Sequence, residues 1–235
     1  IIITFSNKSE FLRKDFSAES VVSSLGRDEF RGRFYGSSKI AAGEITKNGL
    51  ERLRNNFNIE RIDLDYVFKI TLSDSTKMVN SSLVNTLRVK GSSNVTGKGI
   101  GICVLDTGVN YSLSNLGGGL GKKVISGYDY VNSDNDPMDD NGHGTHISGI
   151  IAANGTVTGV APDVNIIALK VLDANGSGPG SNLINGIRWC LDNSSLFNIS
   201  VITMSLACSQ YTNACDSESD CNLPQLRDII NEAVG

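Results

Sequence analysis

The strongest constraint on the fold is the alternation of apolar, strand-like runs with helical patterns after Gly97. The runs KGIGICVLDTG, VNIIALKVL and ISVITMSL are continuous and apolar, and segments with helical spacing, ISGIIAAN and SNLINGIRWCLDNS, separate them. Continuous apolar strands are typical of strands buried on both faces of a parallel sheet. We therefore predict an α/β fold, with a three-layer α/β/α arrangement around a parallel sheet, over residues 98–235.

The first 72 residues follow a different pattern of short strands and helices. Strands are predicted at IIITF, EFRGRFY, KIAAGEI and IERIDLDYVFKITL, and helices at AESVVSSLG and TKNGLERLRNNFN. The order β-α-β-β-α-β predicts a small α+β, ferredoxin-like domain over residues 1–72, with an antiparallel sheet and helices on one face. Residues 73–97 are rich in Ser, Asn and Thr, which is typical of a linker.

Composition narrows the functional classes. The 235 residues carry a net charge of −4, which argues against a nucleic-acid partner held by phosphate contacts. Hydrophobic and charged contents of 40% and 20% describe a soluble globular protein. The sequence has no signal peptide and no apolar run of membrane-spanning length. It opens and closes abruptly, and we expect both ends to have been trimmed.

Two short stretches carry side chains suited to acid–base chemistry. Asp106 ends a buried strand, the position where open α/β sheets place their ligand crevices. His143 and His146, the only two histidines, lie in GHGTH at the start of a helix. A carboxylate near an imidazole would fix its tautomer and stabilise the imidazolium, as a general base requires. A metal site is disfavoured, because H-x-x-H lacks the zincin glutamate and an evident third ligand.

Four blocks resemble, in order and spacing, those of the subtilisin-like serine protease family (subtilases, peptidase S8): VLDTGV, DDNGHGTHISGIIAANG, GVAPDVNIIALKVLD and VITMSLA. Residues 98–235 are similar to the front half of the family's catalytic domain. Residues 1–72 resemble, more loosely, its propeptide, an intramolecular chaperone and inhibitor. The resemblance implies that His143 is the general base, that Asp106 orients it and that His146 is a buried packing residue. Gly142 and Gly144 would let the backbone turn tightly.

The family's G-T-S-x-[AS] block, which carries the nucleophilic serine, is absent from the 235 residues, and so is the oxyanion-hole asparagine. We expect both beyond Gly235. The chain is thus predicted to be an inactive fragment of a secreted serine endopeptidase precursor that needs no cofactor for its chemistry. Two alternatives stay open: a propeptide-type protease inhibitor or chaperone acting in trans, and a non-catalytic interaction protein with the subtilase fold.

By the same resemblance, a peptide substrate would add as a strand between two backbone edges, where small residues are needed. These edges match Gly176, Ser177 and Gly178, and Ser205, Leu206 and Ala207. The family usually has glycine at this position. The methyl group of Ala207 would therefore narrow the cleft. The acidic run DYVNSDNDPMDD predicts either a calcium site or a solvated loop. By the resemblance to subtilases, some heat-stable members of which bind calcium in the matching loop, the calcium ligands would be Asp129, Asp134, Asp136 and the Met138 carbonyl.

The five cysteines divide into two groups. Cys103 and Cys190 fall in strand-like and helix-like runs, and both are predicted to be packed thiols. Cys208, Cys215 and Cys221 lie in a polar stretch that is predicted to be an exposed loop. A disulfide would fit there in a secreted protein, whereas zinc is disfavoured because the paired C-x2-C pattern is missing.

Overall fold

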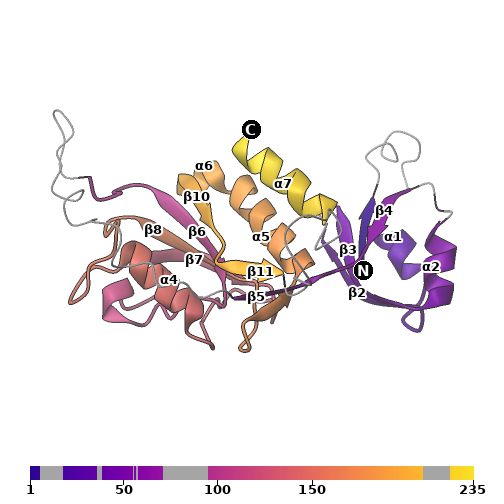
Figure 1. Cartoon of the computed structure of the whole chain (residues 1–235), viewed down its shortest axis with the longest axis horizontal. Coiled ribbons are helices and arrows are strands. Elements are labelled where there is room, and N and C mark those ends of the chain that lie inside the picture. Colours follow the sequence, from indigo (N-terminus) through magenta and orange to yellow (C-terminus); the bar gives the residue numbers. More distant parts are fainter. Residues whose placement is uncertain (6–17, 36–38, 55, 57, 71–94, 209–222) are drawn as a thin grey trace, which may run out of the picture.

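The computed structural model describes residues 1–5, 18–35, 39–54, 56, 58–70, 95–208 and 223–235, with only the backbone at 18–20, 69, 70 and 208. Figure 1 shows a large sheet with its helices beside a smaller sheet that has helices of its own. Most of the predicted linker, together with Cys215 and Cys221, lies outside the described residues.

The smaller sheet has the element order β-α-β-β-α-β that the sequence predicted. Its antiparallel strands lie in the order β2-β3-β1-β4. The elements are β1 (Ile2–Phe5), α1 (Ala18–Ser23), β2 (Phe30–Tyr35), β3 (Ile40–Ile45), α2 (Lys47–Arg54) and β4 (Ile59–Asp63). The prediction of a single strand over IERIDLDYVFKITL is wrong, because this segment forms two strands. The chain leaves this sheet after Asp63, and β5 (Val67–Ile70) pairs in another one.

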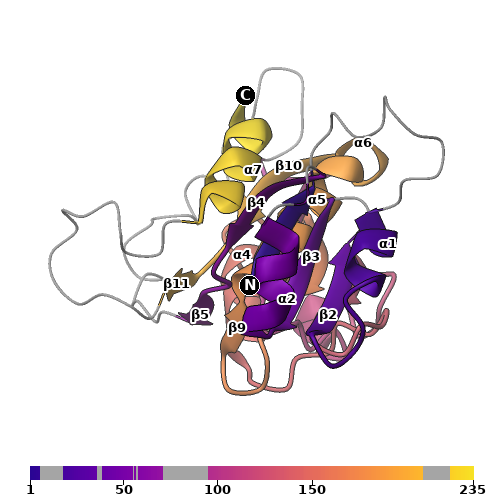
Figure 2. The same cartoon turned by 90° about the vertical axis from the view of Figure 1, so that its right-hand side faces the viewer.

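Alternate residues of the small sheet pack in opposite directions, as strand periodicity requires. Ile3 and Ala41 join a core cluster with residues of α1 and α2, including Leu53. Ile2 and Ala42 belong instead to a cluster that contains Leu183, Leu223 and Ile229. The sheet therefore lies between its own helices and two helices of the C-terminal part, α5 (Gly180–Asp192) and α7 (Pro224–Val234), as Figure 2 shows from the side of α1 and α2.

The large sheet is parallel and has the order β10-β6-β8-β7. Its strands are β6 (Gly101–Asp106), β7 (Val124–Asp129), β8 (Asn165–Lys170) and β10 (Ile199–Thr203). Strand β7 was not predicted, because Ser126 and Gly127 interrupt its apolar run. A 3-10 turn η2 (Ser114–Leu116) and a short helix α6 (Ser194–Phe197) complete this part.

Helices cover both faces of the large sheet, which confirms the predicted three-layer α/β/α arrangement. From β6, Ile102 and Val104 pack in one cluster with Ala152 of α4 (His143–Ala152). Cys103 and Leu105 pack in the opposite cluster, with residues of α5 (Gly180–Asp192) and α7 (Pro224–Val234). Within the residues described, no helix is both long and apolar enough to span a bilayer.

A third, three-stranded sheet joins the two parts. Its order is β11-β5-β9, with β9 (Ser177–Pro179) and β11 (Leu206–Cys208) both antiparallel to β5. The central strand comes from the N-terminal part of the chain, and the outer strands come from the C-terminal part.

The structure joins Cys103 of β6 to Cys190 of α5 by a disulfide, with the two Cα atoms 6.5 Å apart. Both residues are buried, so the sequence pattern predicted their burial correctly. The prediction of two unpaired thiols is wrong. The two residues are 87 positions apart, and periodicity alone gave no sign that the tertiary fold brings their side chains together.

Candidate active site

Asp106 and His143 meet at the carboxyl edge of the large sheet. Asp106 is the last residue of β6 and His143 the first residue of α4. His143 Nδ1 lies 2.7 Å from Asp106 Oδ1, and the two side chains are 3% and 1% exposed. Asp106 Oδ1 also accepts a 2.7 Å hydrogen bond from the Thr107 amide. A carboxylate held on Nδ1 leaves Nε2 as the imidazole nitrogen suited to take a proton from a hydroxyl.

Burial raises the pKa of Asp106 above its ordinary value, although hydrogen bonds from His143 and Thr107 act in the opposite direction. Its second carboxylate oxygen, Oδ2, is buried and accepts no hydrogen bond from the described residues. Holding this carboxylate ionised therefore carries a desolvation cost. Such a cost is typical of groups placed for chemistry rather than for stability.

Two glycines allow this approach, for different reasons. Gly142 precedes α4 with φ at 106°, a left-handed conformation that favours glycine. Gly144 is required by space, not by a turn: a Cβ there would lie 2.1 Å from the Gly108 carbonyl oxygen and 3.1 Å from the Asp106 Cβ. The first turn of α4 can lie against the end of β6 only because position 144 has no side chain.

His146, by contrast, is exposed, so its predicted role as a buried packing residue is wrong. It lies three residues after His143, and its backbone amide donates to the Gly142 carbonyl. Among the described residues it is therefore exposed to solvent rather than packed in the core between α4 and the sheet. The two histidines of GHGTH thus differ sharply, with only His143 buried.

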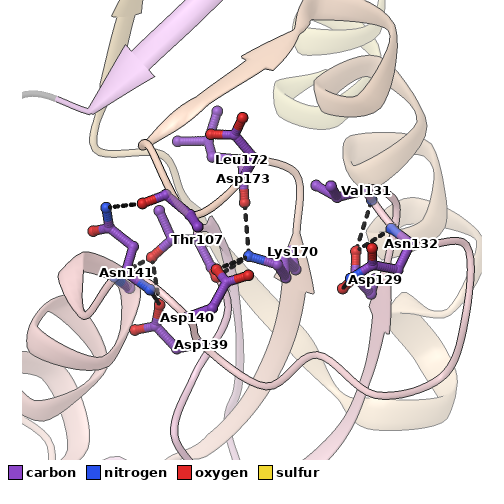
Figure 3. Close-up of polar contacts among 12 residues, drawn as sticks. Thr107, Asp129, Val131, Asn132, Asp139, Asp140, Asn141, Lys170, Leu172 and Asp173 are labelled. Carbon is purple, nitrogen blue, oxygen red and sulfur yellow. Dashed lines mark hydrogen bonds and ion pairs between the residues drawn. The ribbon is translucent and has the colours of Figure 1, made fainter.

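A buried lysine, which the sequence analysis missed, ties together three chain segments around this site. Lys170, the last residue of β8, is 1% exposed. Its Nζ donates to the carbonyls of Thr107 at 2.8 Å and Leu172 at 3.0 Å, and to the Asp140 carboxylate at 2.6 Å (Figure 3). A buried ammonium is tolerated only where its donors are matched in this way. Its position in an otherwise apolar strand was the one available signal.

The two predicted substrate edges are the outer strands of the three-stranded sheet, with β5 between them. Lys69 lies opposite Ser177 on one side and Ala207 on the other, and Phe68 lies opposite Gly178. A Cβ at position 178 would lie 2.2 Å from the Val171 carbonyl oxygen, so only glycine fits there. Residues 67–70 therefore occupy both backbone edges in the way expected of a bound extended peptide. The other predicted edge residues, Gly176, Ser205 and Leu206, adjoin or belong to these strands.

Two carboxylates that the sequence analysis missed organise this region. Asp173 accepts hydrogen bonds from the amides of Asn175 at 2.9 Å and Ser177 at 3.0 Å, which fixes the turn before β9. Asp65 accepts bonds from the amide of Ser181 at 3.1 Å and its hydroxyl at 2.8 Å, at the N-terminus of α5. Burial raises the pKa of Asp65 despite these bonds from Ser181.

The predicted calcium ligands, Asp129, Asp134, Asp136 and Met138, lie at and after the end of β7. The buried Asp129 carboxylate accepts bonds from the amides of Val131 and Asn132 and from the Asn132 side chain, at 2.7 to 2.9 Å (Figure 3). This carboxylate therefore already accepts hydrogen bonds from the loop backbone. Among the described residues, no group of three or more His, Cys, Asp or Glu side chains is placed to hold a metal ion. Calcium at this loop therefore stays a prediction from the sequence.

Comparisons with known proteins show which family this chain resembles. A sequence model described as the subtilase family, Peptidase S8, matches residues 97–234. Serine protease AprX of Bacillus subtilis is 33% identical over 180 residues, which cover 74% of this chain and 38% of that protein. A thermostable alkaline protease of Halalkalibacterium halodurans is 32% identical over 196 residues, which cover 82% and 50%.

A crystal structure of a cold-adapted subtilisin-like serine proteinase, 32% identical, covers 64% of this chain and 48% of its own, with a TM-score of 0.46. The chain spans half or less of the length of the relatives above. The family model matches more than half of the chain, and it includes both Asp106 and His143. The chain therefore belongs to the subtilase family.

Proposed function

We propose that this chain is part of a subtilisin-like serine endopeptidase precursor. Asp106 orients His143, and His143 acts as the general base for a serine that lies outside the 235 residues. The observation that carries the proposal is the 2.7 Å contact between His143 Nδ1 and Asp106 Oδ1 at the carboxyl edge of a parallel sheet. Family membership supports peptide bonds as the substrate class.

In this mechanism, Nε2 of His143 takes the serine proton as the hydroxyl attacks the peptide carbonyl, and later returns it to the leaving amine. Asp106 keeps the proton of the neutral imidazole on Nδ1 and stabilises the imidazolium once it forms. Without the serine, the 235 residues should have no activity through this mechanism. No cofactor enters any step.

Residues 1–72 are proposed to be the inhibitory propeptide, residues 73–97 the linker that contains the processing site, and residues 98–235 the front half of the catalytic domain. The pairing of β5 with both β9 and β11 supports this division, since the strand would block an incoming peptide. The apolar packing of the small sheet against α5 and α7 would hold the inhibitor in place.

The proposal includes secretion of the protein. The disulfide between Cys103 and Cys190 supports it, because such bonds persist mainly in oxidising compartments. Calcium at the 129–138 loop is carried only as a prediction from the acidic sequence. Titration calorimetry that detects no binding at millimolar Ca²⁺ would remove it.

The test is a hydrolysis assay on the product of the gene read past Gly235. We expect it to cleave a denatured protein substrate after removal of residues 1–72. His143→Ala and Asp106→Asn should lower kcat by at least about 10³-fold, whereas His146→Gln, at an exposed position in the same helix, should not. Full activity of His143→Ala, or no serine block in the complete gene, would overturn the proposal.

A further inference from the structure

Asp139 lies between the end of β6 and the first turn of α4, and its carboxylate accepts five hydrogen bonds. Its Oδ1 accepts from the Thr107 hydroxyl at 2.9 Å and from the amides of Asn141 at 3.0 Å and Gly142 at 2.9 Å. Its Oδ2 accepts from the Thr145 amide at 2.9 Å and from the Thr145 hydroxyl. One side chain thus connects the strand that bears Asp106 to the helix that bears His143.

Thr107 extends this connection on both sides. It is fully buried, and its amide donates to Asp106 Oδ1. Its hydroxyl oxygen accepts a 3.0 Å bond from the Gly144 amide. The single hydroxyl proton is therefore directed at Asp139, since an amide can only donate. Figure 3 shows the contact between Thr107 and Asp139.

The same bonds satisfy the start of α4. The first amides of a helix have no partner within it, and a side chain at the N-cap position commonly supplies one. Gly142, at the N-cap position, has no side chain to do so. The amides of Gly142 and Thr145 donate to Asp139, and that of Gly144 donates to Thr107. The Thr107 hydroxyl, just after β6, and the Asp139 carboxylate thus fix the position of the turn that carries His143.

We propose that Asp139, through the Thr107 hydroxyl and the first amides of α4, is a positioning residue that holds the His143 imidazole against Asp106. The proposal rests on the proposed function, because it concerns the same pair of residues. Asp139 does not touch the reacting atoms in this account. It acts by setting the separation between a strand end and a helix start.

The protonation state of Asp139 agrees with this role. Partial burial would raise its pKa, but the hydrogen bonds from Gly142, Thr145 and Asn141 hold that pKa below the ordinary value. An ionised carboxylate is also favoured at a helix N-terminus by the helix dipole. Asp139 therefore stays an acceptor on both oxygens at neutral pH.

The test uses the 235-residue chain and needs no peptidase activity. In a His146→Gln background, His143 is the only histidine, and its hydrogen-bonded Nδ1 proton is followed by low-field proton NMR. We expect this resonance in the parent and in Thr107→Ser, which keeps the hydroxyl. It should be lost or shifted upfield in Asp139→Ala, and also in Thr107→Val, which removes only the hydroxyl at nearly constant volume.

Asp163→Asn is the matched control, because Asp163 is an exposed carboxylate in another loop and should leave the resonance unchanged. Amide dispersion in the same spectra reports whether each variant folds. If Asp139→Ala does not fold, Thr107→Val decides. A folded Asp139→Ala or Thr107→Val with an unchanged Nδ1 resonance would overturn the proposal.

In the longer gene product, Asp139→Ala should lower kcat by about 10²-fold, the cost expected of a small misplacement of a catalytic group, and leave KM nearly unchanged. Equal effects of Thr107→Ser and Thr107→Val would count against the hydroxyl link. If the parent itself is inactive, the proposed function fails. If it is active and Asp139→Ala changes neither kcat nor the resonance, only the positioning role fails.

Discussion

Phe68 of β5 lies directly opposite Gly178 of β9 in an antiparallel pairing. The Phe68 side chain is only 7% exposed and belongs to the same core cluster as Leu183 and Leu223. A Cβ on Gly180 would come within 3.0 Å of its ring, so a small residue at that position leaves room for the ring. Phe68 therefore anchors the N-terminal part of the chain between β9 and β11.

Truncation of this anchor should release β5. Phe68→Ala removes a buried aromatic side chain, a change that typically costs about 3–5 kcal/mol. We expect faster amide hydrogen exchange over residues 66–70, measured by mass spectrometry, with little change in β6 and β8. Val67→Ala is the control, since Val67 is 46% exposed. Unchanged exchange over residues 66–70 in Phe68→Ala would contradict the anchoring role.

Two glycines of α4 should respond in opposite ways to alanine. At Gly144 the new Cβ would meet the Gly108 carbonyl oxygen at 2.1 Å, and overpacking of this kind costs about 1–3 kcal/mol. At Gly149 no atom lies within 4 Å of the new Cβ. Alanine has less conformational entropy than glycine in the unfolded chain, so this change should raise the free energy of unfolding by about 0.5–1 kcal/mol. Thermal unfolding measures both. A Gly144→Ala variant as stable as the parent would be inconsistent with this packing.

The disulfide between Cys103 and Cys190 should be chemically present and stabilising. Peptide mapping without reductant should recover the linked pair. The double variant Cys103→Ala, Cys190→Ala should lose about 2–5 kcal/mol of unfolding free energy, the usual cost of removing a native disulfide. Alkylation of both cysteines in the unreduced, denatured protein would show that they are free thiols and would refute this prediction.

Asp106 and Asp139 should influence the pH dependence of stability with opposite signs. The raised pKa of Asp106 means that the folded state binds its proton more tightly than the unfolded state does. The contribution of Asp106 to folding stability is therefore favourable below pH 3.8, its ordinary pKa, and is lost as the pH rises through the pKa of the folded state. Asp106→Asn should be at least as stable as the parent at pH 7, and that relative gain should disappear in acid.

The lowered pKa of Asp139 gives the reverse. The contribution of Asp139 to folding stability is present above pH 3.8, its ordinary pKa, and is lost as the pH falls through the pKa of the folded state. Asp139→Asn should be less stable than the parent at pH 7, by about 1–3 kcal/mol for the hydrogen bonds left unmade, with a smaller difference in acid. Urea unfolding at pH 3 and pH 7 tests both variants. The same sign of change for both at pH 7 would contradict the account.

Much of the fold could be predicted because apolar periodicity reports burial directly. The strands at Gly101–Asp106 and Asn165–Lys170 and the helix over Gly180–Asp192 follow from continuous or helical apolar spacing. The break between β4 and β5 could not be predicted from the sequence, because an alternating pattern indicates a strand but not the sheet in which that strand pairs. The sheet in which β5 pairs depends on two strands, β9 and β11, that lie more than 100 positions further along the chain.

The site was predicted only in part, for a similar reason. Asp106 and His143 could be found because their blocks resemble a known family. Asp139 and Lys170 act through contacts made in the folded chain, and each is ambiguous in sequence: one is an acid within an acidic run, the other a lysine ending an apolar strand. The exposure of His146 likewise depends on packing that the GHGTH pattern does not specify.

The most direct test of the central claim is labelling with a fluorophosphonate, which reacts with a serine activated by a histidine base. We expect no labelling of the 235-residue chain, because the proposed nucleophilic serine lies outside it. The gene product extended past Gly235 should be labelled at one serine, and His143→Ala should abolish that labelling. Labelling of any serine within the 235 residues, or labelling of the longer product that survives His143→Ala, would contradict the account.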